Sequence, residues 1–259
     1  MIAADRRPLR GRILEGETLF GLFLDLGSPI SAELASRAGY DWLVIDLEHG
    51  AATEADLLLL LHAVEAGGAT PLVRPQSGER LRIGRALDMG ARGIIVPRLN
   101  SAEEAREVVS FLRYPPEGVR GVALRARGAD LGAFTHDRVG EISQRIVGLV
   151  QIESTGALAD ADAIAAIDGV DVLFVGPADL SHSLGVPGRF TEPIYRDALT
   201  TVVAACRAHG KAAGILVYDP AVVSAHLELG FRFVGIGSDG AFIADGAGRS
   251  LAAVRPAAT

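Results

Sequence analysis

The stretch that decides the fold lies at residues 147–180 and reads VGLVQIESTGALADADAIAAIDGVDVLFVGPADL. It begins with a short apolar run, Val147–Glu153, continues with a helical pattern over Thr155–Ile167 and ends with a second apolar run, Val172–Gly176. Short β-rich runs on either side of a helix are typical of a βαβ unit in a parallel sheet. The sequence therefore predicts a sheet built from such units.

The same alternation extends outward to both ends of the chain. Eight apolar runs are predicted strands: Leu19–Leu24, Trp42–Asp46, Pro71–Arg74, Gly93–Pro97, Val147–Glu153, Val172–Gly176, Ala213–Val217 and Phe231–Gly237. A helical pattern follows each of them: Ser31–Ala38, Glu54–Ala66, Glu79–Met89, Ser101–Leu112, Thr155–Ile167, Pro193–His209, Pro220–Leu229 and Ala241–Val254. Eight βα units predict a single (β/α)8 TIM barrel over residues 1–259, because a doubly wound sheet would not accommodate all eight predicted strands.

Two segments depart from this regular alternation. Residues 113–145 form a connection longer than usual, and long loops are usually lids, binding loops or interface arms. We assign Arg113–Gly128 to that class and predict a short extra helix over Asp137–Arg145. Near the end of the chain, Gly246 and Gly248 are predicted to interrupt the last helix.

The composition narrows the class of function. Of 259 residues, 49% are apolar and 22% charged, and the net charge of −7 comes without a basic block. This balance predicts no nucleic-acid partner and no anionic membrane surface, so small-molecule chemistry is expected. The run Leu19–Leu24 is too short to span a bilayer, and Met1–Arg10 lacks the apolar core of a signal peptide. The single cysteine, Cys206, cannot form an internal disulfide and is predicted to be a buried helix residue, so we expect a cytoplasmic protein.

Polar residues at the carboxyl ends of the strands are the candidate site, because barrels place their active sites there. Alternate residues of a strand share a face. Since Val150 and Ile152 suit the layer under the helices, Gln151 and Glu153 are predicted to face inward. Asp179 follows the next strand in a turn made tight by neighbouring glycine and proline.

Glu153 and Asp179 are candidate metal ligands. A carboxylate in so apolar a run is costly to bury without a partner, and a bound cation supplies one. Two carboxylates with water in the remaining positions form the oxygen-rich site that Mg²⁺ or Mn²⁺ prefers. In the alternative interpretation, Glu153 pairs with Arg74 and Asp179 only caps a helix.

Arg74 and His49 complete the candidate site. The planar guanidinium of Arg74 suits an anionic substrate, although an ion pair with Asp46, Glu48 or Glu153 would explain it equally well. His49 is the candidate acid/base residue because its charge changes near neutral pH, and Asp46, three residues earlier, could fix its tautomer.

Six motifs in chain order carry a resemblance to a known family. They are Trp42–His49, Val73–Pro75, Leu87–Ala91, Arg113–Gly121, Gln151–Glu153 and Gly176–Ser181. Together they resemble the 4-hydroxy-2-oxoheptanedioate aldolase / 2-dehydro-3-deoxyglucarate aldolase family of metal-dependent, class II pyruvate aldolases. The resemblance implies a barrel of the phosphoenolpyruvate/pyruvate-domain type and a lyase of aromatic or sugar-acid catabolism that uses Mg²⁺, Mn²⁺ or Co²⁺.

The resemblance also implies roles for individual residues. Glu153 and Asp179 would be the metal ligands, Arg74 would contact the pyruvate end of the substrate, and His49 would be the acid/base residue. Either Asp46 or Asp88 would be the partner of His49. The substrate, a 4-hydroxy-2-oxo acid or its products pyruvate and an aldehyde, is expected to contact the following residues: Arg74, Gln151, Ala178, Asp179 and Leu216.

Family resemblance further implies a homohexamer in which the C-terminal helix, about residues 241–254, is swapped onto a neighbouring subunit. The two glycines of this helix and the short tail Arg255–Thr259 depart from that pattern.

Aldol cleavage of a 2-oxo acid needs an electron sink, either a lysine Schiff base or a Lewis-acid metal. The only lysine, Lys211, precedes the seventh strand and should lie at the far end of the barrel. A metal-dependent aldolase is therefore the main interpretation. The alternatives are a related lyase acting on an acyl-CoA thioester (citryl- or malyl-CoA lyase-like) and a non-catalytic binding barrel.

Overall fold

A closed barrel of eight parallel strands forms the centre of the molecule in the computed structural model, which describes residues 7–255. Each strand pairs with its neighbours in sequence, and β8 pairs with β1. The strands are β1 (Leu19–Leu24), β2 (Trp42–Asp46), β3 (Thr70–Arg74), β4 (Gly93–Val96), β5 (Val147–Ile152), β6 (Val172–Val175), β7 (Ala212–Val217) and β8 (Phe233–Ser238). This confirms the predicted fold class, with every strand within two residues of its predicted bounds.

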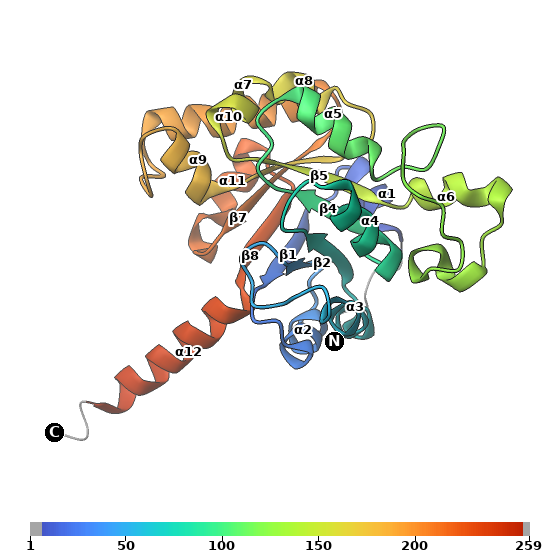
Figure 1. Cartoon of the computed structure of the whole chain (residues 1–259). Helices are drawn as coiled ribbons and strands as arrows, with labels where there is room; N and C mark the ends of the chain where they lie inside the picture. Colours follow the sequence, from blue (N-terminus) through green and yellow to red (C-terminus); the bar gives the residue numbers. More distant parts are fainter. Residues whose placement is uncertain (1–6, 256–259) are drawn as a thin grey trace.

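Helices surround the barrel and follow the strands in turn (Figure 1). The α-helices are α1 (Leu9–Leu14), α2 (Pro29–Arg37), α3 (Leu57–Gly67), α4 (Arg80–Met89), α5 (Ala102–Ser110), α6 (Val139–Ser143), α7 (Thr155–Ala159), α8 (Ala161–Ala165), α9 (Pro177–Ser183), α10 (Pro193–Ala208), α11 (Val223–Leu229) and α12 (Asp239–Val254). Three short 3₁₀ helices add to them: η1 (Arg127–Gly132), η2 (His136–Arg138) and η3 (Pro220–Val222).

Two helical predictions need correction and one is confirmed. The pattern over residues 155–167 forms two helices, because Asp160 leaves helical geometry (φ −92°, ψ 8°) and links α7 to α8. α12 runs through Gly246 and Gly248 without a break, so the predicted interruption is wrong. The extra helix before the fifth strand is present as η2 and α6.

The barrel interior is filled by aromatic rings. Trp42 stacks on Phe233 with ring centroids 4.2 Å apart, and Phe174 packs edge-on against both rings. A side chain at Gly21 would collide with the Trp42 indole, since its Cβ would lie 2.0 Å from a ring atom. The barrel interior is thus a packed core and not a pore.

Strand residues of the opposite parity point outward to the helices. Val150 and Ile152 belong to the apolar layer between barrel and helices, as predicted from the strand pattern. Gln151, between them, is on the inner face and hydrogen-bonds to Glu153. The alternation of inward and outward residues along β5 therefore predicted correctly that Gln151 faces the barrel interior.

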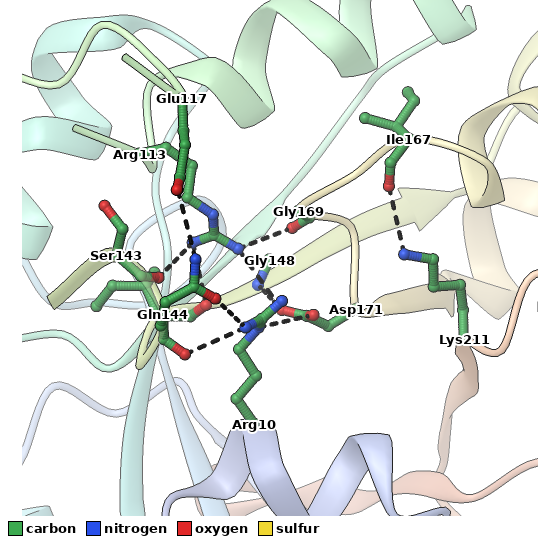
Figure 2. Close-up of polar contacts among 11 residues, drawn as sticks. Arg10, Arg113, Glu117, Ser143, Gln144, Gly148, Ile167, Gly169, Asp171 and Lys211 are labelled. Atoms are coloured by element: carbon green, nitrogen blue, oxygen red, sulfur yellow. Dashed lines mark hydrogen bonds and ion pairs between the residues drawn. The ribbon is translucent and has the colours of Figure 1, made fainter. Parts of the chain in front are cut away.

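The amino end of the barrel is closed by α1, a helix that is not among those predicted from the sequence. Its Leu9 and Ile13 pack into the interior cluster. Arg10 Nε donates to the buried Asp171 carboxylate at 2.9 Å, and the buried Arg113 guanidinium lies 3.9 Å from the same carboxylate (Figure 2). Lys211 lies at this end too, with Nζ 3.4 Å from the Ile167 carbonyl oxygen.

α12 leaves the carboxyl end of the barrel and extends away from it (Figure 1). The first residue of α12, Asp239, anchors the helix to the barrel. Its Oδ1 accepts hydrogen bonds from the backbone N–H groups of Asp25 and Gly240. Ser31 donates to the other carboxylate oxygen at 2.5 Å. Burial, and then the hydrogen bond with the Asp25 carboxyl, raise the pKa of Asp239. Over residues 7–255, no helix has the length and apolar character needed to cross a membrane.

Candidate active site

An ion pair between adjacent strands anchors the carboxyl mouth of the barrel. Asp46 ends β2, Arg74 ends β3, and the two residues are directly opposite in the strand register. Arg74 Nε and Nη2 donate to the two oxygens of Asp46 at 2.9 and 2.6 Å. This bidentate pair fixes the plane of the guanidinium and leaves Nη1 outside the pair. Of the predicted partners of Arg74, the structure places Asp46 and Glu48 beside it, the latter 3.4 Å from Nε.

Glu48 is the carboxylate closest to the His49 imidazole. Its Oε2 lies 3.8 Å from His49 Nε2, and the His49 side chain is 62% exposed at the mouth. Burial, reinforced by Asp46, raises the pKa of Glu48, although Arg74 and His49 lower it. Asp46 accepts a hydrogen bond from the backbone N–H of His49, at 3.3 Å, rather than from its ring.

Glu153 is held from two sides. Its Oε1 accepts a hydrogen bond from the backbone N–H of Arg98 at 2.6 Å, and its Oε2 accepts one from Gln151 Nε2 at 2.9 Å. The residue is only 8% exposed. Burial raises the pKa of the Glu153 carboxyl, and the nearby Asp179 charge raises it further. A buried carboxylate, Glu153, thus lies within electrostatic reach of an exposed one, Asp179.

The remaining predicted substrate contacts also lie at this mouth. Ala178 and Asp179 are exposed in the first turn of α9, directly after β6. Leu216 is half-buried on the inner face of β7 and packs on the interior cluster. The structure thus brings together every predicted site residue except Asp88.

Asp88 lies in the last turn of α4, which runs back toward the amino end of the barrel. Its carboxylate pairs with the buried Arg120 at 2.9 Å. Within this chain Asp88 is not beside His49. A helix that follows a barrel strand starts at the mouth and runs antiparallel to the strand, so residues in its last turn lie far from the mouth. Arg127, which also belongs to the long loop, is bound to Glu65 and the Met89 carbonyl oxygen.

Two features of the mouth were not identified from the sequence. Glu48, rather than an aspartate, lies nearest the imidazole, although it is adjacent to His49 in the chain and was considered only as a partner of Arg74. The backbone N–H of Arg98 supports Glu153, and no sequence pattern could indicate it because every residue type except proline offers that group.

The donor set fits a divalent cation. The buried Gln151 Oε1 has no hydrogen-bond partner, and such a group usually indicates a missing ligand, water or ion. Gly176 faces Glu153, and a Cβ there would lie 2.8 Å from Glu153 Oε2, so the missing side chain keeps this space open. Residues 7–255 contain no cluster of three or more His, Cys, Asp or Glu side chains arranged for a metal. Two carboxylates with water and substrate oxygens are the kind of set that Mg²⁺ accepts.

Comparison with known proteins agrees with this geometry. The sequence profile described as HpcH/HpaI aldolase/citrate lyase matches residues 19–245. A 2-keto-3-deoxy-L-rhamnonate aldolase of Klebsiella pneumoniae is 42% identical over 232 residues, which cover 90% of this chain and 87% of the relative. A hydroxypyruvate/pyruvate aldolase of Agrobacterium fabrum is 41% identical over 236 residues, covering 91% and 89%.

The fold comparison gives the same result. The crystal structure of an HpcH/HpaI aldolase/citrate lyase family protein from Burkholderia cenocepacia superposes with a TM-score of 0.90 at 36% identity, covering 95% of this chain and 98% of that one. The two curated relatives are aldolases, so the thioester lyase and the non-catalytic barrel are not favoured. The chain therefore belongs to the HpcH/HpaI aldolase/citrate lyase family, and it is an aldolase, a carbon–carbon lyase.

Proposed function

We propose that this aldolase requires a divalent cation and cleaves 4-hydroxy-2-oxo acids reversibly to pyruvate and an aldehyde. The observation that carries the proposal is the buried Glu153, which is hydrogen-bonded to Gln151, a residue with an unpaired buried oxygen, and whose pKa the nearby Asp179 charge raises. A cation at this position would remove the repulsion between the carboxylates and satisfy that oxygen. Mg²⁺, Mn²⁺ and Co²⁺ all suit an oxygen-rich site of this kind.

When bound, the cation would act as a Lewis acid toward the carboxylate and 2-oxo oxygens of the substrate. Arg74 supports the same half of the substrate. Its Nε and Nη2 are occupied by Asp46, so its free Nη1 can donate to a substrate oxygen without any change of side-chain conformation. The ion pair holds the guanidinium in place before the substrate arrives, which lowers the entropic cost of orienting it.

His49 is proposed to move the proton of the 4-hydroxyl group or of the enolate carbon, directly or through a water. Its imidazole is exposed at the mouth, and Glu48 Oε2 lies 3.8 Å from its Nε2. Arg74 Nε lies 3.4 Å from the same Glu48 oxygen, Oε2. Asp46 is proposed to position both groups, since it binds the guanidinium of Arg74 and the backbone of His49.

A pyruvate-release assay over a panel of 4-hydroxy-2-oxo acids tests the function. Activity should disappear after treatment with a chelator and return with Mn²⁺, Co²⁺ or Mg²⁺. Glu153→Gln and Asp179→Asn should abolish both activity and Mn²⁺ binding measured by calorimetry. The matched control is Glu103→Gln, which removes an exposed carboxylate from α5, outside the candidate site. Full activity of the chelator-treated enzyme would contradict the metal requirement.

The sugar-acid branch of catabolism is the proposed setting, because the relative from K. pneumoniae is named for a deoxy sugar acid. The cytoplasmic location and the single-domain subunit over residues 1–259 remain predictions of the sequence.

We also propose that subunits form a homo-oligomer, a hexamer by family resemblance, through exchange of α12. The helix carries exposed apolar side chains, among them Phe242 (43% exposed), Ile243 (59%) and Leu251 (50%), and it projects from its own barrel (Figure 1). A second copy that covered this face would remove apolar surface from water. Light scattering should give an oligomeric mass for the whole chain and a smaller one after truncation before Ala241.

A further inference from the structure

Arg98 lies at the carboxyl mouth of the barrel and has an unusual backbone conformation. It lies two residues beyond the end of β4, and its N–H is the group that holds Glu153 Oε1 at 2.6 Å. Its φ of 60° is in the left-handed region, where a residue with a side chain costs about 1 kcal/mol or more relative to glycine. The backbone contact with Glu153 requires only an N–H group. The long charged side chain at this position therefore needs a separate explanation.

The guanidinium of Arg98 has no carboxylate partner within 4.0 Å among residues 7–255. Its side chain is exposed, whereas the neighbouring cation at the mouth, Arg74, is bound by Asp46 through two nitrogens. Arg98 can accordingly bind an anion without breaking an existing ion pair. Such a pair would form at no cost in lost protein contacts.

The Arg98 charge acts across the mouth. It lowers the pKa of Glu48, which follows β2, although burial keeps that pKa above its ordinary value. The backbone of the same residue is fixed at the end of β5 through Glu153. Arg98 is thus an exposed cation at the mouth, directly beside Glu153, which is proposed to hold the pyruvate half of the substrate together with Arg74.

We infer that Arg98 binds an acidic group, a carboxylate or a phosphate, on the aldehyde half of the substrate, and that the enzyme therefore prefers anionic aldehydes. This inference rests on the proposed function, which assigns the pyruvate half to Glu153, Asp179 and Arg74. Arg98 is then a specificity residue. Its charge selects the acceptor, and it takes no part in proton transfer.

Pairs of aldehydes that differ in charge test the inference in the synthetic direction, with pyruvate and Mn²⁺ saturating. Glyoxylate is compared with glycolaldehyde, and glyceraldehyde 3-phosphate with glyceraldehyde. The first pair places the charge next to the carbonyl group and the second places it two carbons further away. In Arg98→Met, kcat/KM for the charged member of at least one pair should fall about 10–100-fold, the effect of losing one charge-assisted hydrogen bond. The neutral members should stay within about twofold.

Matched variants separate the side chain from the backbone. Arg98→Lys should retain part of the preference, and Arg98→Gly should lose it although its backbone is relaxed. Arg106→Met removes an exposed arginine from α5 and should change nothing. Higher salt should weaken the preference of the unmodified enzyme because exposed charges are screened.

An equal loss for charged and neutral aldehydes in Arg98→Met would overturn the inference, since it would show that the residue acts only through Glu153. Unchanged kcat/KM for every aldehyde in Arg98→Met, Arg98→Lys and Arg98→Gly would overturn it too. In both cases the proposed function stands as long as the unmodified enzyme forms the aldol products. An unmodified enzyme that forms none would refute the proposed function and this inference together.

Discussion

Substitution of Gly176 by alanine tests the candidate metal site without removing any of its polar groups. Gly176 follows β6 and faces Glu153. The new Cβ would lie 2.8 Å from Glu153 Oε2, 3.1 Å from Glu153 Cβ and 3.3 Å from Gln151 Nε2. Since φ at this position is −89°, alanine is compatible with the backbone. The carboxylate must move instead, by several tenths of an ångström.

The magnitude follows from what that movement disturbs. Turning the Glu153 side chain out of its rotamer costs about 0.5–1.5 kcal/mol. It also weakens the hydrogen bond from the Arg98 N–H, and a bond to a charged group contributes about 1.5–3 kcal/mol. A partial loss of both terms corresponds to about 10–100-fold weaker metal binding, the range typical of changes next to a metal ligand. The fold should survive, because the end of a side chain can move more easily than backbone.

Calorimetric titration with Mn²⁺ measures this effect, and thermal unfolding with and without Mn²⁺ checks it. Gly176→Ala should show the weaker affinity and a smaller rise in Tm on addition of Mn²⁺. Gly84→Ala is the control, since a Cβ there has no atom within 4 Å and helix α4 should become slightly more stable. A folded Gly176→Ala protein with unchanged Mn²⁺ affinity would refute the assignment of Glu153 as a ligand.

Four further predictions concern the mouth and the opposite end of the barrel. His49→Ala should retain Mn²⁺ binding but lose about 10²–10⁴-fold in kcat, whereas His182→Ala, on the exposed last turn of α9, should keep its activity; equal activities would remove the role given to His49. Arg74→Lys should lower kcat/KM by the equivalent of about 2 kcal/mol or more for all aldehydes alike, because lysine cannot reproduce the bidentate pair; a loss confined to acidic aldehydes would contradict this. Borohydride with pyruvate should leave no adduct on Lys211, and Lys211→Met should remain active, since its Nζ lies at the amino end; a trapped adduct would restore the Schiff-base mechanism. Asp171→Ala should destabilise the protein by about 3–5 kcal/mol in urea unfolding because it leaves a buried arginine uncompensated, and a loss below about 1 kcal/mol would show that this network contributes little.

The sequence alone was sufficient for the architecture. Eight short apolar runs separated by helical patterns can be satisfied by one closed parallel sheet, and every run became a strand. The period of two along β5 also determined that Gln151 and Glu153 face inward while Val150 and Ile152 face the helices. These features depend on local periodicity, which a sequence displays directly.

The tertiary structure alone decided which groups meet at the mouth. Asp46 pairs with Arg74 because β2 and β3 are in register, and Glu48 lies nearest His49 because the chain turns after β2. Asp88, expected as an alternative partner, is carried to the other end by the direction of α4. Contacts of this kind depend on strand register, helix direction and backbone N–H groups, as at Arg98, and these leave no pattern in residue identity because they arise only when distant segments pack together.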